Sequence, residues 1–115
     1  MPKIEIGFEW SKVIEDCLSR NAIFFTRHAK REMEKEEFGL ILTSEVFEAM
    51  NHNQILEVYP DDNPYPRALI LGTTSQGRPI HFVGAYDQES RQLIIVTVYQ
   101  PDPARWIAYK ELREQ

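Results

Sequence analysis

Residues 54–99 read QILEVYPDDNPYPRALILGTTSQGRPIHFVGAYDQESRQLIIVTVY, and this stretch decides the fold. Short apolar runs alternate with segments rich in Pro, Gly, Asn, Asp and Ser, a pattern typical of strands joined by turns. The runs predict strands at 54–59, 67–73, 79–86 and 92–99. Connections this short join consecutive strands as hairpins, so we predict one antiparallel four-stranded β-meander. The last run is almost wholly apolar, which predicts a central strand or one covered on both faces.

Upstream of this stretch the hydrophobic pattern changes to the period of a helix. A first helix is predicted from about Phe8 to Arg20, with an apolar stripe that should face the core. The stripe consists of Trp10, Val13, Ile14, Cys17 and Leu18. Thr26 can cap a second helix that continues to about Glu37, and Gly39 can terminate it.

A short third helix is predicted to begin at Thr43 or Ser44. After the last strand, Asp102 followed by Pro103 predicts a closing helix, because aspartate caps helices and proline is tolerated in their first turn. The predicted fold is therefore α+β, with two to three N-terminal helices packed on the meander and a short C-terminal helix.

Composition limits the cellular context and the partners. The chain has 115 residues, 43% hydrophobic and 27% charged, which fits a single domain over residues 1–115. A single cysteine cannot form an internal disulfide, so the cytoplasm is the expected compartment. The N-terminal segment lacks a signal-peptide core and no stretch is long enough to span a bilayer, so we expect no membrane association. With a net charge of −5, any RNA-directed role needs a local basic cluster.

His28 is the first candidate for chemistry. It lies in the segment Thr-Arg-His-Ala-Lys-Arg, in the first turn of the predicted second helix. Arg31 and Glu32 share its helical face, and Lys35 follows one turn later. A helix N-terminus favours anions, so an imidazole beside an arginine there can meet a phosphate. The alternative is an exposed histidine on a solvated helix face.

His81 is the second candidate and lies inside the third predicted strand. Strand alternation sends His81 to one face with Val83, while Ile80 and Phe82 point to the other. A histidine in a sheet is often a hydrogen-bonded structural residue. It can equally be half of an acid–base pair, because its ordinary pKa lies near neutrality.

Three further residues have both a functional and a structural interpretation. Arg67 and Arg78 stand near strand starts on either side of one hairpin, where they can neutralise a phosphate or simply lie at the surface. Tyr99 ends the last strand and can donate a proton or pack. The histidines and Cys17 have no metal-ligand spacing, so no metal is expected. The sequence has no phosphate-binding glycine loop and no nucleophile elbow, and no cofactor is expected.

Three pieces of sequence, in order, resemble a known family. They are Phe25-Thr26-x-His28-Ala29 with Met33, then Gly77-x-Pro79-Ile80-His81-Phe82-Val83, then Thr97-Val98-Tyr99-x-Pro101-Asp102-x-x-x-Trp106. They resemble a family of small bacterial proteins classed as a domain of unknown function. That family is considered RelE-like, within the barnase–EndoU–colicin–RelE group of ribonucleases. The resemblance covers roughly residues 24–107, and the order of helices before the meander agrees with it.

The resemblance implies a metal-independent endoribonuclease toxin of a toxin–antitoxin pair. In that reaction the ribose 2′-hydroxyl attacks the adjacent phosphate, which requires a base, an acid and a cation for the crowded phosphorane. On this chain His28 and His81 become the acid–base candidates, with Tyr99 as a lesser one. We expect both imidazoles on one side of the domain, within reach of one phosphodiester. The candidates for binding the substrate are Arg31, Lys35, Arg67 and Arg78.

The resemblance also has a departure and implies partners. Family members often carry arginine where this chain has Glu32 and Glu36, although Arg31 and Lys35 stand beside those positions. The candidate partners are RNA, free or on the ribosome, a cognate antitoxin protein, and a second copy of the chain in a homodimer. The alternative function is a non-catalytic module on the same fold that binds a protein or a small ligand, with the histidines lining its pocket.

Overall fold

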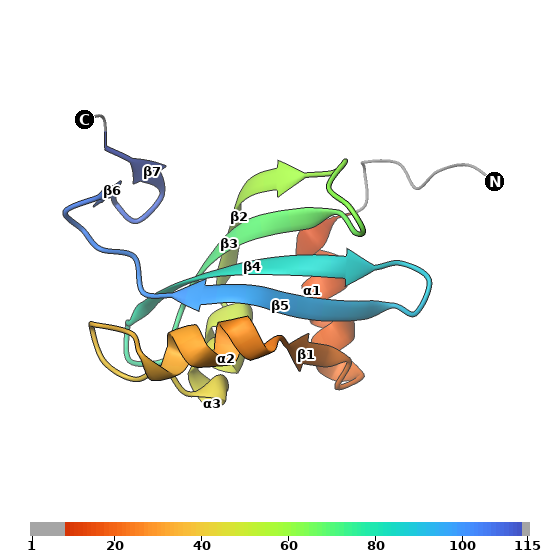
Figure 1. The fold of residues 1–115 in the computed structure, drawn as a ribbon, viewed down its shortest axis with the longest axis horizontal. Helices are drawn as coiled ribbons and strands as arrows, with labels where there is room; N and C mark the ends of the chain where they lie inside the picture. Colours follow the sequence, from red (N-terminus) through yellow and green to blue (C-terminus); the bar gives the residue numbers. More distant parts are fainter. Residues whose placement is uncertain (1–8, 114–115) are drawn as a thin grey trace.

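The computed structural model describes residues 9–113, which form a five-stranded sheet, three helices and a small separate hairpin (Figure 1). The helices are α1 (Trp10–Ser19), α2 (Arg27–Glu34) and α3 (Thr43–Met50). The strands of the sheet are β1 (Ile23–Phe25), β2 (Asn53–Tyr59), β3 (Arg67–Thr73), β4 (Pro79–Asp87) and β5 (Gln92–Tyr99). The hairpin consists of β6 (Trp106–Ile107) and β7 (Glu111–Leu112). No helix among the described residues is long and apolar enough to cross a membrane.

The meander is confirmed, and the sheet contains one strand more than predicted. Strands β2 to β5 pair antiparallel in sequence order, and each begins and ends within one residue of its predicted position. The additional strand β1 pairs parallel with β5, which makes β5 a central strand. No local pattern predicted β1, because three residues are too few to show a period and their partners lie about seventy residues further along the chain.

The predicted helices exist, with one boundary corrected. Thr26 caps α2 as expected, since its hydroxyl accepts a hydrogen bond from the Ala29 N–H at 3.0 Å. However, α2 ends at Glu34 instead of Glu37, and Gly39 lies in the following loop with φ 113. At α3 the Leu42 N–H donates to the Glu45 carboxylate at 2.9 Å, which satisfies one amide of the first turn. The expected first residue of the first helix, Phe8, lies outside the described residues.

One face of the sheet packs against the helices and forms the core. Four residues of the predicted α1 stripe are buried there, and Leu18 is partly buried against them. The sheet contributes residues such as Ile70, Ile80 and Phe82, so the predicted alternation around His81 is confirmed. α3 packs so closely on β3 at Gly72 that a Cβ added there would overlap the Ala49 carbonyl oxygen.

The predicted C-terminal helix is wrong. Asp102 does begin one helical turn, in which its side chain accepts from the Ala104 N–H at 2.9 Å and its carbonyl from the next two amides. The chain then reverses, because Ala108 and Tyr109 adopt left-handed φ values of 51 and 62. The result is the β6–β7 hairpin, which stands apart from the helices at the end of β5 (Figure 1). In this form Trp106 packs edge to face on His81, with the ring centroids 4.4 Å apart.

Candidate functional site

The site begins where α2 takes over from β1 along the edge of β5. β1 pairs with residues 93–95, and the Thr26 N–H then donates to the Ile95 carbonyl at 3.0 Å. Beyond this point no strand of the described part of the chain pairs with that edge of β5. Instead the Glu32 carboxylate accepts from the Val98 N–H at 3.0 Å, and the Glu36 carboxylate from the Gln100 N–H at 2.7 Å. Two side chains of α2 and its loop thus replace a missing strand partner.

These contacts give Glu32 and Glu36 a structural role that arginine could not fill. A carboxylate can accept a backbone N–H, whereas a guanidinium can only donate. Sequence reasoning missed this role, because the accepted amides lie more than sixty residues away along the chain. The spacing of the two glutamates by four residues was a signal that they share one helical face, but it did not name the partner.

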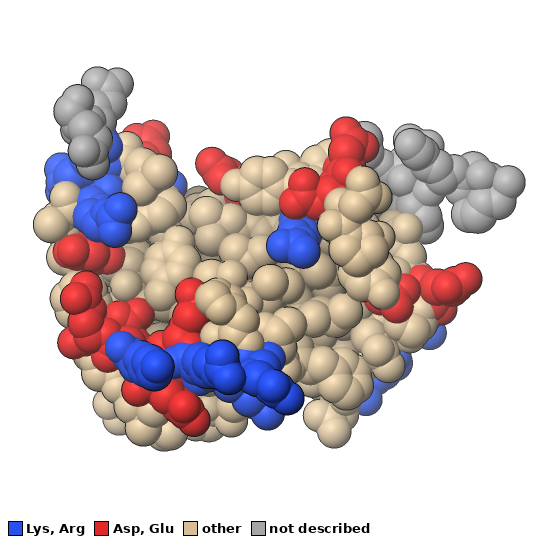
Figure 2. All heavy atoms as spheres, viewed as in Figure 1, with Lys and Arg blue, Asp and Glu red and all other residues tan. Residues whose placement is uncertain are grey.

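An open cleft of about 440 Å³ lies beside this edge. Its lining comes from α2, the loop after it and the end of β5, namely His28, Arg31, Glu32, Lys35, Glu36, Glu37 and Tyr99. Figure 2 shows Lys and Arg side chains in a row over α2, with acidic side chains beside them. The structure therefore brings four predicted site residues together around one cleft: His28, Arg31, Lys35 and Tyr99.

His28 is solvent-accessible and has a carboxylate neighbour. Its side chain is 67% exposed, and its Nε2 lies 3.4 Å from Glu32 Oε2. The other oxygen of the same carboxylate holds the Val98 amide, so Glu32 is fixed by the sheet and can orient the imidazole. When the ring is protonated, this contact is an ion pair. An imidazole placed in this way can transfer a proton to or from a bound group.

Tyr99 links the cleft to His81. The side chain of Tyr99 lines the cleft, and its hydroxyl lies 3.0 Å from His81 Nδ1. Burial raises the pKa of the Tyr99 phenol, and the nearby carboxylates of Glu32 and Glu57 raise it further. The phenol is therefore a hydrogen-bond donor at neutral pH.

His81 itself is fully buried and does not line the cleft. Its ring is covered by Trp106, whose ring centroid lies 4.4 Å away, and its Nε2 lies 2.6 Å from the Tyr109 carbonyl oxygen. Burial lowers the pKa of His81, and the hydrogen bond to Tyr109 partly opposes this effect. The structure thus does not show the expected direct access of one phosphodiester to both imidazoles, because the C-terminal hairpin covers one of them.

The two remaining arginines have different surroundings. Arg78 is occupied within the fold, since its guanidinium donates to the carbonyls of Gly39 and Leu40, to the Glu45 carboxylate and to Gln100. It ties the loop after α2 to the start of β4. Arg67 lies on the sheet face opposite the core, and its Nε is buried without a hydrogen-bond partner among the described residues. Neither arginine lines the cleft beside α2.

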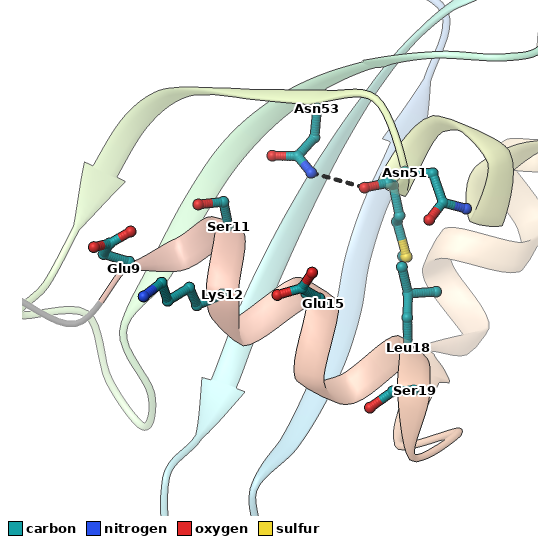
Figure 3. A pocket seen from close by; sticks show the side chains of 9 residues that line it. Glu9, Ser11, Lys12, Glu15, Leu18, Ser19, Asn51 and Asn53 are labelled. Atoms are coloured by element: carbon teal, nitrogen blue, oxygen red, sulfur yellow. Dashed lines mark hydrogen bonds between the residues drawn. The ribbon is translucent and has the colours of Figure 1, made fainter.

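A larger hollow of about 770 Å³ lies elsewhere, between α1 and the connection from α3 to β2. Figure 3 shows Ser11, Lys12, Glu15 and Ser19 of α1 on one side and Asn51 and Asn53 on the other. The Asn53 side chain donates to the Met50 carbonyl at 2.7 Å, so it serves the local turn. Among residues 9–113, no histidine, tyrosine or arginine lines this hollow, which makes the smaller cleft the better candidate for chemistry. Within residues 9–113 no group of His, Cys, Asp and Glu side chains is arranged to hold a metal ion.

The fold and the cleft define a class of small α+β proteins in which a helix follows the edge of a meander and carries a polar site. A model of the family described as domain of unknown function DUF4258 matches residues 25–100, and the chain belongs to that family. The matched region begins just before α2 and ends after β5, so it contains His28, His81 and Tyr99. Searches among curated proteins and among solved structures gave no match.

Proposed function

We propose that the chain is a RelE-like endoribonuclease toxin that cleaves RNA without a metal at the cleft between α2 and β5. The observation that carries this proposal is the grouping of His28, Tyr99, Arg31 and Lys35 around one open cleft. Together these side chains offer an imidazole, a phenol and two cations, which are the groups that attack by a ribose 2′-hydroxyl requires. RNA, free or on the ribosome, is the proposed substrate, and a cognate antitoxin is the proposed partner in the cytoplasm.

Each residue has a distinct role in the proposed reaction. Protonated His28, held by Glu32, donates a proton to the 5′-oxygen that leaves the phosphate. Tyr99 contacts the attacking 2′-hydroxyl from the opposite wall of the cleft. Arg31 and Lys35 stabilise the negative charge that grows on the phosphorane oxygens. The products are a 2′,3′-cyclic phosphate and a free 5′-hydroxyl.

The carboxylates in the cleft are compatible with a bound phosphate. Three glutamates line the cleft beside the two cations. These carboxylates would repel a bound anion if none of them had a partner within the fold. Two of them, Glu32 and Glu36, each accept a backbone N–H from β5, and Glu32 also faces His28. These contacts partly offset the negative charge that the two carboxylates present to the cleft. Binding should weaken as salt rises, and the slope should be shallow because only a few local cations contact the phosphates.

Purified protein tests the proposal in buffer that contains a chelator. We expect the wild type to cleave single-stranded RNA, and His28→Asn to lower the rate by roughly 10²-fold or more, the usual contribution of an acid–base group. His52→Asn is the matched control, because His52 is exposed and lies outside the cleft. Expression of the wild type should slow growth, and His28→Asn should relieve it. A wild type that neither cleaves RNA nor slows growth would leave a binding module as the better account.

A further inference from the structure

The buried imidazole of His81 has both of its nitrogens engaged. Nδ1 faces the Tyr99 hydroxyl at 3.0 Å, and Nε2 faces the Tyr109 carbonyl oxygen at 2.6 Å. A carbonyl oxygen can only accept, so Nε2 must carry the proton. In the neutral ring Nδ1 is then an acceptor, and the Tyr99 hydroxyl must donate to it. The direction of both hydrogen bonds follows from one backbone carbonyl.

The C-terminal hairpin supplies that carbonyl and the cover over the ring. Trp106 meets His81 edge to face, with ring planes at 86°. Ala108 and Tyr109 occupy the left-handed region of φ, which is uncommon for residues other than glycine and turns the Tyr109 carbonyl toward the imidazole. Because the Tyr109 carbonyl requires a proton on Nε2, the buried neutral ring of His81 adopts a single tautomer.

We propose that His81 is a positioning residue that stores, through the Tyr99 hydroxyl, the proton that leaves the ribose 2′-hydroxyl, and that the C-terminal hairpin fixes the tautomer this requires. The inference rests on the proposed function. A phenol that keeps its proton at neutral pH is a poor base by itself. It can accept a proton on its oxygen only if its own proton moves on, and His81 Nδ1 is the acceptor in reach.

The proton balance of the step is complete. The 2′-hydroxyl oxygen forms its bond to phosphorus as its proton passes to the Tyr99 oxygen. The Tyr99 proton passes to His81 Nδ1, and the resulting imidazolium keeps its Nε2–H on the Tyr109 carbonyl. His28 donates the proton that the departing 5′-oxygen takes up. In the neutral ring, which burial favours, Nδ1 carries no proton and can accept, and the hydrogen bond to the Tyr109 carbonyl stabilises the imidazolium that forms.

The tautomer can be tested without RNA. Nitrogen-15 NMR of the full-length wild type at neutral pH should show a protonated Nε2 and a bare Nδ1 on His81. The opposite tautomer, or rapid exchange between both, would overturn the proposal. Trp106→Ala should loosen the cover and produce exchange between tautomers. Ile107→Ala, at an exposed position on the same hairpin, should leave the spectrum of His81 as in the wild type.

Cleavage by His81→Asn tests the storage of the proton. Asparagine can offer an oxygen to the Tyr99 hydroxyl but cannot take up its proton. We expect a rate loss of roughly 10²-fold, and no further loss when His81→Asn is added to Tyr99→Phe, because groups that act as one unit are not additive. If the wild type cleaves RNA and His81→Asn cleaves it equally fast, the role of His81 falls while the proposed function stands. If the wild type cleaves no RNA, both fall. If His81→Asn does not fold, cleavage by Trp106→Ala takes its place, because an unchanged rate in a variant whose His81 exchanges between tautomers would overturn the proposal.

Discussion

At the residue scale, the burial of His81 gives the protein a specific pH dependence of stability. The pKa of this imidazole is lower in the folded chain than its ordinary value of 6.5, chiefly because of burial. The unfolded state therefore binds a proton more readily, so stability is full above pH 6.5 and is lost as the pH falls toward the folded pKa. We expect the urea midpoint to decline over that window in the wild type. In His81→Asn the decline should be weaker, and in His52→Asn it should remain.

Arg67 presents a different kind of buried polar atom, and its replacement should stabilise the fold. Its Nε lies buried with no hydrogen-bond partner among residues 9–113, and an unsatisfied buried donor costs roughly 1–3 kcal/mol. Arg67→Met keeps the aliphatic bulk and removes the donor. The free energy of unfolding in urea should rise by roughly 1 kcal/mol. Arg27→Met, at an exposed position on α2, should change it by less than about 0.5 kcal/mol. A clear loss in Arg67→Met would show that the guanidinium has a partner.

At the element scale, the carboxylates of Glu32 and Glu36 accept backbone hydrogen bonds that a neighbouring strand would otherwise accept. Glu36→Ala would leave the Gln100 N–H without its acceptor at the edge of β5. We expect the free energy of unfolding to fall by about 1 kcal/mol, the usual net value of such a hydrogen bond. Hydrogen exchange at the Gln100 amide should become faster. Glu34→Ala is the control, because Glu34 is exposed and has no such contact. Unchanged exchange at Gln100 would contradict this role for the glutamate.

The elements that the sequence predicted well are those with a local signal. Alternation and turn residues fixed the strands of the meander, and the spacing of Ile14 and its neighbours fixed the buried face of α1. β1 and the C-terminal hairpin were missed because distant partners determine them. β1 depends on its pairing with β5, and the hairpin depends on the contact between Trp106 and His81. Local capping by Asp102 was correct, but this contact limited it to a single turn.

In the candidate site, too, features with a local signal were predicted, and features that depend on distant contacts were missed. The helical spacing of His28, Arg31 and Lys35 predicted a shared face, and these side chains do line one cleft. Strand alternation predicted the face of His81 but not its cover, because the covering residues lie in a segment expected to be helical. Arg78 was predicted either to neutralise a phosphate or to lie at the surface, and only the folded chain shows that its guanidinium donates to carbonyls of the loop after α2.

At the scale of the whole molecule, the helices and the C-terminal hairpin lie on opposite faces of the sheet. The helices pack on one face of the sheet, and Trp106 and Tyr109 of the hairpin cover His81 on the other. The cleft lies at the edge where these layers meet, with α2 on one wall and Tyr99 on the other. This arrangement places the exposed imidazole of His28 at the cleft and the buried imidazole of His81 behind the Tyr99 hydroxyl.

The measurement that tests the central claim most directly is cleavage of two matched oligonucleotides in chelator. One is all ribose, and the other carries a 2′-O-methyl group at every ribose, which removes the attacking hydroxyl. The account predicts that the wild type cleaves the first and leaves a 2′,3′-cyclic phosphate, that it does not cleave the second, and that Tyr99→Phe cleaves the first far more slowly. Equal cleavage of both oligonucleotides, or of neither, would contradict it.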